Sequence, residues 1–130
     1  MAINQAKLVR GVGASMYRQV SQNGYATAVQ TLMDMEILSK ADYERWRNGQ
    51  VPYLEKVCNI NLKKLASILA EMKRYADRTG LKPSFTFYKQ WGRKNKPTVK
   101  LRFCKTGNEY MEKLYATHYV KNTFGQVDHK

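Results

Sequence analysis

The chain has 130 residues, of which 23 are Lys or Arg and 10 are Asp or Glu, so its formal net charge is +13. Its hydrophobic content of 43% excludes a wholly disordered chain, and its three prolines and eight glycines exclude collagen-like and linker-like sequences. No apolar run approaches the ~18 residues of a membrane span, and the first residues, MAINQAKLVRG, lack the apolar core of a signal peptide. We therefore expect a soluble, cytoplasmic protein with no membrane partner.

The first third of the chain predicts short helices. Two glycines indicate an irregular or frayed-helical segment over residues 1–13. The pair Asn23-Gly24 separates a helix near 14–22 from a second helix over about 25–36. Apolar residues recur at helical spacing along the second helix, and we assign this stripe to core packing.

Capping residues mark the helices in the middle of the chain. Ser39 is typical of a helix start and predicts a helix over about 40–48. A proline suits the first position of a short helix over 52–58. Asn61 then begins a longer amphipathic helix from 62 to about 78, which a glycine ends.

After Lys82-Pro83 the hydrophobic period changes from 3.6 residues to 2. The runs SFTFYKQW and TVKLRFCK alternate in this way, and the loop between them is rich in Gly, Lys and Pro, so we predict a β-hairpin over about 84–105. One face is expected to pack on the helices: Phe85, Phe87, Val99, Leu101 and Phe103. The other face is expected to point to solvent: Thr86, Tyr88, Lys100 and Arg102.

The sequence Thr106-Gly-Asn-Glu109 predicts the start of a last helix, from about 108 to 119, followed by a frayed tail over 121–130. These elements predict an α+β fold. Four to five helices form its N-terminal part, a basic β-hairpin follows, and the C-terminal helix covers the apolar side of the hairpin. We expect residues 1–120 to form a single compact domain.

The positive charge is concentrated in one segment. Residues 82–105 contain eight basic and no acidic residues, whereas residues 1–81 contain 12 basic and 7 acidic residues and residues 106–130 contain three of each. A solvated face normally mixes both signs, so this acid-free cluster favours a polyanionic partner. The alternative is a hairpin whose charges only prevent its edges from pairing with other strands.

We therefore predict a nucleic-acid-binding site on the hairpin, because a two-stranded ribbon fits a DNA groove and a basic loop follows a phosphate backbone. Phosphates would be contacted by Lys89, Arg93, Lys94, Lys96, Lys100, Arg102 and Lys105, and Tyr88 would stack on a base or form a hydrogen bond. A secondary patch, Arg45 and Arg47, lies in a helix-turn-helix outline predicted over 24–50. The Trp46 between them is more typical of a core residue.

The sequence lacks the motifs of catalysis and metal binding that we sought. It has no P-loop, dinucleotide fingerprint or nucleophile elbow, and its carboxylates are too scattered to predict a metal-dependent nuclease. Cys58, Cys104, His118 and His129 lack the spacing of a zinc site. We expect two reduced thiols, a packed His118, no cofactor or metal, and no enzymatic activity.

The predicted function is non-catalytic binding of DNA or RNA. DNA is favoured because the chain lacks the paired aromatic sheet motifs that stack RNA bases. A function of a different class stays open: a small interaction or inhibitor protein of the mobile-element type that docks on a protein or nucleoprotein complex, such as a host nuclease. A nucleic-acid binder would bind unrelated oligonucleotides with a steep salt dependence, whereas an interaction protein would keep its partner after nucleic acid is digested away.

Overall fold

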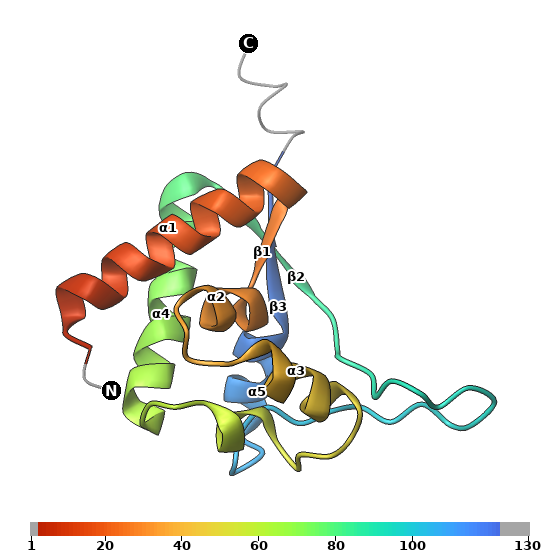
Figure 1. Ribbon diagram of the computed structural model, residues 1–130. Coiled ribbons are helices and arrows are strands. Elements are labelled where there is room, and N and C mark those ends of the chain that lie inside the picture. The colour runs from red at the N-terminus through yellow and green to blue at the C-terminus, as the bar shows by residue number, and fades with distance from the viewer. Residues whose placement is uncertain (1–2, 123–130) are drawn as a thin grey trace.

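The computed structural model describes residues 3–122, and over this range it contains five α-helices, one short 3-10 helix and a three-stranded antiparallel sheet (Figure 1). The α+β fold with a helical N-terminal part is therefore confirmed. The α-helices are α1 (Gln5–Asn23), α2 (Ala28–Asp34), α3 (Lys40–Arg47), α4 (Leu62–Thr79) and α5 (Glu109–Ala116). The 3-10 helix is η1 (Leu54–Val57), and the strands are β1 (Tyr25–Thr27), β2 (Lys82–Phe85) and β3 (Thr117–Val120).

Helix α1 is continuous from Gln5, so the irregular or frayed-helical segment predicted over 1–13 is wrong. Residues 14–22 are helical as predicted, but they belong to α1 and do not form a separate helix. Asn4 caps the helix, because its side-chain oxygen accepts a hydrogen bond from the amide three residues later. The glycines do not break α1, because its apolar stripe is buried along the helix and tertiary packing outweighs local propensity. A Cβ on Gly11 would lie 2.9 Å from Met35 Cε, so this glycine permits a close approach of the next segment.

The single helix predicted over about 25–36 is divided into β1 and α2. Strand β1 pairs antiparallel with β3, and Thr27 at its end caps α2 by accepting a hydrogen bond from the Gln30 amide at 3.0 Å. The predicted core stripe survives in α2, where Val29 and Leu32 are buried. Pairing with a distant strand therefore determines the first residues of this segment, and local periodicity does not.

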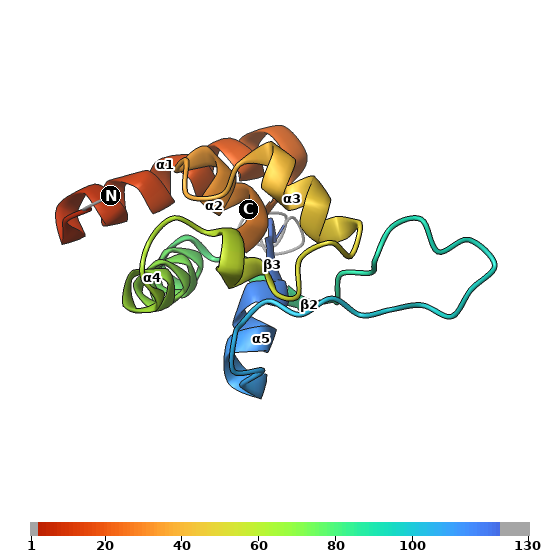
Figure 2. The ribbon, with the colours of Figure 1, turned by 60° about the horizontal axis from the view of Figure 1, so that its bottom comes forward.

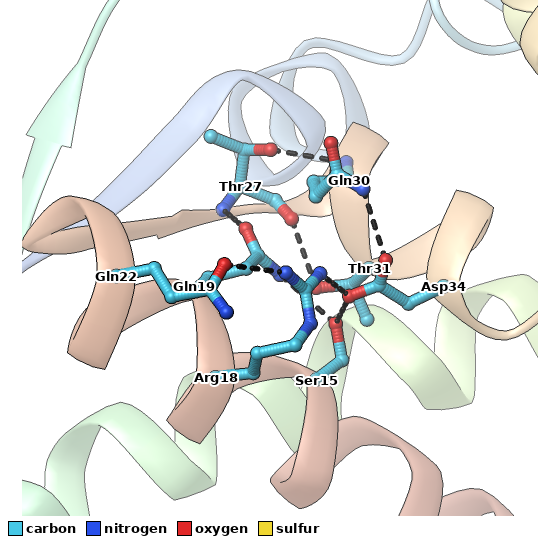
Figure 3. Close-up of polar contacts among 8 residues, drawn as sticks. All are labelled: Ser15, Arg18, Gln19, Gln22, Thr27, Gln30, Thr31 and Asp34. Carbon is cyan, nitrogen blue, oxygen red and sulfur yellow. Dashed lines mark hydrogen bonds and ion pairs between the residues drawn. The ribbon is translucent and has the colours of Figure 1, made fainter.

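A network of polar side chains joins α1, β1 and α2 (Figure 3). We name it the α1–α2 polar cluster: Ser15, Arg18, Gln19, Gln22, Thr27, Gln30, Thr31 and Asp34. At its centre the buried Gln19 amide donates hydrogen bonds to Ser15 Oγ at 3.0 Å and Thr31 Oγ1 at 2.9 Å. The Gln19 carbonyl oxygen accepts a hydrogen bond from the Thr27 amide at 2.8 Å. The cluster satisfies polar groups that would otherwise be costly to bury.

The helices predicted over about 40–48 and 62–78 are confirmed as α3 and α4. Ser39 Oγ accepts a hydrogen bond from the amide three residues later at 3.0 Å, and Asn61 caps α4 in the same way at 2.8 Å. The helix predicted over 52–58 is wrong in extent, because only the short 3-10 helix η1 forms there.

The sheet has the strand order β1-β3-β2, so β3 is central and pairs antiparallel with both neighbours. The helix predicted over about 108–119 is therefore too long, because its last residues form β3. Its N-cap is Asn108, whose side chain accepts a hydrogen bond from the amide three residues later at 3.0 Å, rather than Thr106.

The buried side chains come from helices, strands and the loops between them. The largest include Leu8, Leu32, Trp46, Leu65, Phe103 and Tyr115. Between β2 and α5 the chain leaves this body as a long loop, which projects away from the helices in both ribbon views (Figures 1 and 2). None of the helices within residues 3–122 is long and apolar enough to cross a membrane. Most of the tail predicted over 121–130 lies outside the described residues.

Candidate nucleic-acid interface

The projecting loop carries most of the basic segment 82–105. We name residues 86–100 the arm and residues 101–105 its root. The two limbs of the arm run antiparallel but share a single β-bridge, between Lys89 and Lys100, flanked by backbone hydrogen bonds of 2.8 and 2.9 Å. The two-stranded β-hairpin predicted over about 84–105 is therefore wrong as a continuous ladder, because β2 pairs with β3 instead of with the second limb.

Local hydrogen bonds close the tip of the arm. Gly92 and Asn95 have positive φ angles of 77° and 63°, as a tight reversal of the chain requires. The Lys96 amide donates to the Arg93 carbonyl at 3.0 Å. Arg93 Nε donates to the Pro97 carbonyl at 3.0 Å, so this guanidinium stabilises the turn as well as carrying charge.

Backbone hydrogen bonds attach the root to the helical body. The Arg102 carbonyl accepts from the Trp46 indole N–H at 2.8 Å and from the Leu54 amide at 3.2 Å. The Phe103 carbonyl accepts from the Glu55 amide at 2.9 Å. Because α3 and η1 supply these donors, the root has a defined position against the body.

Two carboxylates bind the amides of the root. Glu112 of α5 accepts hydrogen bonds from the Phe103 amide at 3.1 Å and the Cys104 amide at 2.8 Å. Glu55 of η1 accepts from the Lys105 amide at 2.9 Å. These two carboxylates lie close to the basic segment in space, but they accept hydrogen bonds from its backbone amides.

Aromatic rings pack around Phe103 beneath the arm. Phe103 stacks on Tyr115 with ring centroids 5.2 Å apart and planes within 2°, so α5 covers the apolar side of the second limb as predicted. Trp46 and Tyr88 lie 5.1 and 5.3 Å from the same ring. The Tyr115 hydroxyl donates to Glu55 at 2.7 Å, and burial together with this carboxylate raises the pKa of Tyr115.

Tyr88 lies on the inner side of the arm, so the expectation that it faces solvent, where it could stack on a base, is wrong. Tyr88 is only 8% exposed, and its hydroxyl forms a hydrogen bond with His118 Nε2 at 3.2 Å. Burial raises the pKa of Tyr88 to about 12. Leu101, the first residue of the root, is also buried, as predicted. Only the first limb therefore has its inward and outward side chains exchanged relative to the prediction.

The inversion places Phe85 and Phe87 on the outer side, 60% and 49% exposed, and the packing predicted for them on the helices is wrong. Lys89 continues the same alternation and lies directly opposite Lys100. The flanking hydrogen bonds make these lysines a non-hydrogen-bonded antiparallel pair, the kind whose side chains approach most closely. Like charges at such positions repel, so the outer side of the arm presents concentrated positive charge.

The remaining predicted cations lie along the same loop. Exposed lysines are Lys89, Lys94, Lys96, Lys100 and Lys105. Arg102 is exposed as well, and its Nη2 donates to the Cys104 and Lys105 carbonyls at 3.1 and 2.8 Å. The side-chain ion pairs within residues 3–122 all lie between residues 18 and 78, so none involves the basic segment.

The helix-turn-helix outline predicted over 24–50 becomes β1, α2 and α3. Trp46 of α3 is fully buried against the root, as predicted for a core residue. Arg45 is exposed and pairs with Asp42 at 2.9 Å. Helix α3 thus packs against the root, and Arg45 is the weaker half of the predicted secondary patch because an acid already partners it.

The structure brings Arg47, by contrast, against the first limb of the arm. Its guanidinium carbon lies 4.8 Å from the Trp91 ring centroid and 5.0 Å from that of Tyr88. Its carbonyl accepts from the Trp91 amide at 2.7 Å. Arg47 lines a cavity of about 370 Å³ together with Lys89 and Arg93, so three cations from two parts of the chain converge there.

Within residues 3–122 no three His, Cys, Asp or Glu side chains gather closely enough to hold a metal ion. Cys58 and Cys104 are free thiols, as expected, and burial raises the pKa of Cys58 to about 12. His118 packs on Tyr25 with ring centroids 5.4 Å apart, and burial lowers its pKa. His129 lies outside the described residues.

No family model, curated protein or solved structure was found to match this chain. Among the described residues, the basic arm is the feature that bears most directly on function.

The exposed surface on and beside the arm also includes Phe85, Phe87 and Lys113. The sequence did not predict them as site residues. Lys113 Nζ lies 4.2 Å from the Phe85 ring centroid. The run SFTFY offered only a weak signal, since Phe and Tyr both suit an apolar face and alternation alone does not say which faces inward.

Proposed function

We propose that this protein is a non-catalytic nucleic-acid-binding protein whose arm contacts phosphates of DNA or RNA. The observation that carries the proposal is the projecting acid-free loop, with Lys89 directly opposite Lys100 at its base (Figure 2). A cross-strand lysine pair disfavours the free arm, and a bound polyanion would relieve this repulsion. The carboxylates nearest the root bind backbone amides, so they leave this charge available to a ligand.

The phosphate-binding residues proposed are those on the arm and root: Lys89, Arg93, Lys94, Lys96, Lys100, Arg102 and Lys105. Arg47 joins them from α3, since it lines a cavity with Lys89 and Arg93. Phosphate contacts release counterions, so affinity depends steeply on salt. With about six contacts, binding should weaken by roughly 10³-fold between 50 and 200 mM salt.

The test is a fourfold substitution of exposed lysines, Lys89→Ala, Lys94→Ala, Lys96→Ala and Lys100→Ala, measured by fluorescence anisotropy with labelled DNA and RNA. Arg93 and Arg102 are left in place because they bond backbone carbonyls of the loop. The matched control removes four exposed lysines of the body: Lys7, Lys40, Lys56 and Lys63. Both variants have the same net charge, so a difference between them reports the location of the site.

We expect the arm variant to lose most of its affinity and to lower the salt slope by about three to four, whereas the control changes binding much less. Each substitution should change the free energy of unfolding by no more than about 0.5 kcal/mol, because the removed groups are surface lysines. Equal losses in the two variants would contradict an arm-centred site. If the parent binds neither DNA nor RNA at 50 mM salt, the proposal fails, and the alternative of a protein or nucleoprotein partner takes its place.

A further inference from the structure

We infer that the nucleic acid bound by the arm is single-stranded, with unpaired bases stacking on Phe85 and Phe87; this rests on the proposed function. The two rings belong to consecutive outward positions of one extended limb, so their Cα atoms are about 6.6 Å apart. These two large apolar rings are 60% and 49% exposed, and they lie within the basic segment 82–105, which contains no acidic residue. Aromatic platforms within a basic groove are the shared feature of single-strand-binding proteins.

Phe85 lines a cavity that holds both charged and apolar side chains, among them Lys73, Lys113 and Leu114. Lys113 Nζ lies over one face of the ring, 4.2 Å from its centroid, so the ring carries a cation on that side while most of its surface is exposed. A ligand that offers both flat rings and negative charge matches this pattern, and a nucleotide offers both.

The surroundings of Phe87 repeat the same combination. Phe87 lines an open cavity of about 490 Å³ together with Lys100, Arg102 and Lys113. Two carboxylates, Glu109 and Glu112, also line this cavity. Glu112 accepts hydrogen bonds from amides of the root, whereas Glu109 is an acceptor suited to the exocyclic amino group of a base. The cavity is large enough for a base beside Phe87, with three cations positioned for its phosphates.

Base pairing distinguishes the possible ligands. In a duplex the bases stack on each other inside the helix, so a flat aromatic side chain on a projecting limb finds no free base face on which to stack. In a single strand every base has a free face for stacking. The rings therefore add affinity for single strands alone, while the lysines add affinity for both.

The experiment compares three labelled ligands at 100 mM salt: a 16-nucleotide oligo-dT, a 16-nucleotide abasic strand with the same phosphates, and a 16-base-pair duplex. The proteins are the parent, the variant Phe85→Ala with Phe87→Ala, and a control that removes two exposed apolar side chains elsewhere, Tyr17→Ala with Leu62→Ala. All the substituted residues are exposed, and circular dichroism melting checks that each variant is folded. Oligo-U of the same length extends the comparison to RNA.

The parent should bind oligo-dT at least 10-fold more tightly than the abasic strand, because each stacked base contributes a factor of about 5 to 150. The Phe85/Phe87 variant should lose this preference, keep its binding to the abasic strand and keep its salt slope. The Tyr17/Leu62 control should match the parent. Equal binding of all three ligands, unchanged in the Phe85/Phe87 variant, would overturn the single-strand inference and leave the phosphate-binding function intact. Binding of none of them, even at 50 mM salt, would overturn both.

Discussion

The α1–α2 polar cluster and the arm use charged side chains in opposite ways. In the cluster, Arg18 forms an ion pair with Asp34, and Gln19 uses both ends of its amide (Figure 3). In the arm, Lys89 lies opposite another cation, Lys100, and no described ion pair involves either residue. Polar groups satisfied within the fold stabilise it, whereas cations without acid partners are available for a ligand.

The difference extends to the acids beside the arm. Glu55 and Glu112 are close enough to the root to bind its amides, and they bind these instead of the nearby cations. The body thus orders the base of the arm without neutralising it. An ordered base and a free charge are what a preorganised phosphate-binding surface requires.

The largest expected effect comes from breaking the connection between the helical body and the root of the arm at Trp46. This side chain is fully buried, contacts Phe103 and donates to the Arg102 carbonyl. Trp46→Ala should lower the free energy of unfolding by about 3–5 kcal/mol, measured by urea denaturation. Trp46→Phe keeps a ring and loses the N–H, so it should cost less. A loss below about 1 kcal/mol for Trp46→Ala would show that the root does not depend on this contact.

A smaller effect is expected inside the α1–α2 polar cluster. Gln19→Ala removes an amide that bonds Ser15, Thr27 and Thr31, and it leaves the Thr27 amide without its acceptor. Ser15 and Thr31 keep hydrogen bonds to Asp34 and to the Thr27 carbonyl. The free energy of unfolding should fall by about 2–3 kcal/mol, while nucleic-acid affinity of the folded protein stays unchanged. The comparison would be contradicted if the variant kept its stability or if the folded variant bound more weakly.

The smallest effect is a change in pH dependence at Asp34. Burial opposes ionisation of this carboxylate, but hydrogen bonds from Arg18, Ser15 and Gln30 outweigh it and lower the pKa of Asp34 below its usual range. A depressed folded-state pKa stabilises the native state above the unfolded-state pKa, and this stabilisation is lost as the pH falls through the folded value.

Asp34→Asn should therefore be less stable than the parent at pH 7. The difference should shrink as the pH falls below about 4, the ordinary aspartate pKa, and through the lower folded-state pKa, where the parent carboxylate also becomes neutral. Thermal unfolding between pH 2 and 7 measures both curves. Parallel curves for the two proteins would show that Asp34 does not contribute through its charge.

The sequence predicted those elements whose ends and faces are determined locally. Ser39 and Asn61 cap α3 and α4 with their own side chains, so the information lies within one helical turn. Strands β1 and β3 were missed because each is formed by pairing with a distant segment. Helix α1 was interrupted in the prediction because glycine propensity was given more weight than the packing that Gly11 permits.

The candidate site also has one part that could be predicted from the sequence and one part that could not. The basic segment was predicted, because charge is read directly from composition and solvent keeps lysines at the surface. The orientation of the first limb was not, because Phe87 and Tyr88 suit an apolar face about equally. Contacts with Phe103 and His118, which come from later in the chain, place Tyr88 inward and leave Phe87 outside.

The most direct test of the account is a map of amide chemical shifts in ¹⁵N-labelled protein during titration with an oligonucleotide at low salt. We expect the largest changes at amides of residues 82–105, including those beside Lys89 and Lys100, and no significant changes across the α1–α2 polar cluster. Changes centred on that cluster or on the exposed basic residues of α4, with the arm unaffected, would contradict the claim that the arm is the nucleic-acid-binding surface. These residues of α4 are Lys63, Lys73, Arg74 and Arg78.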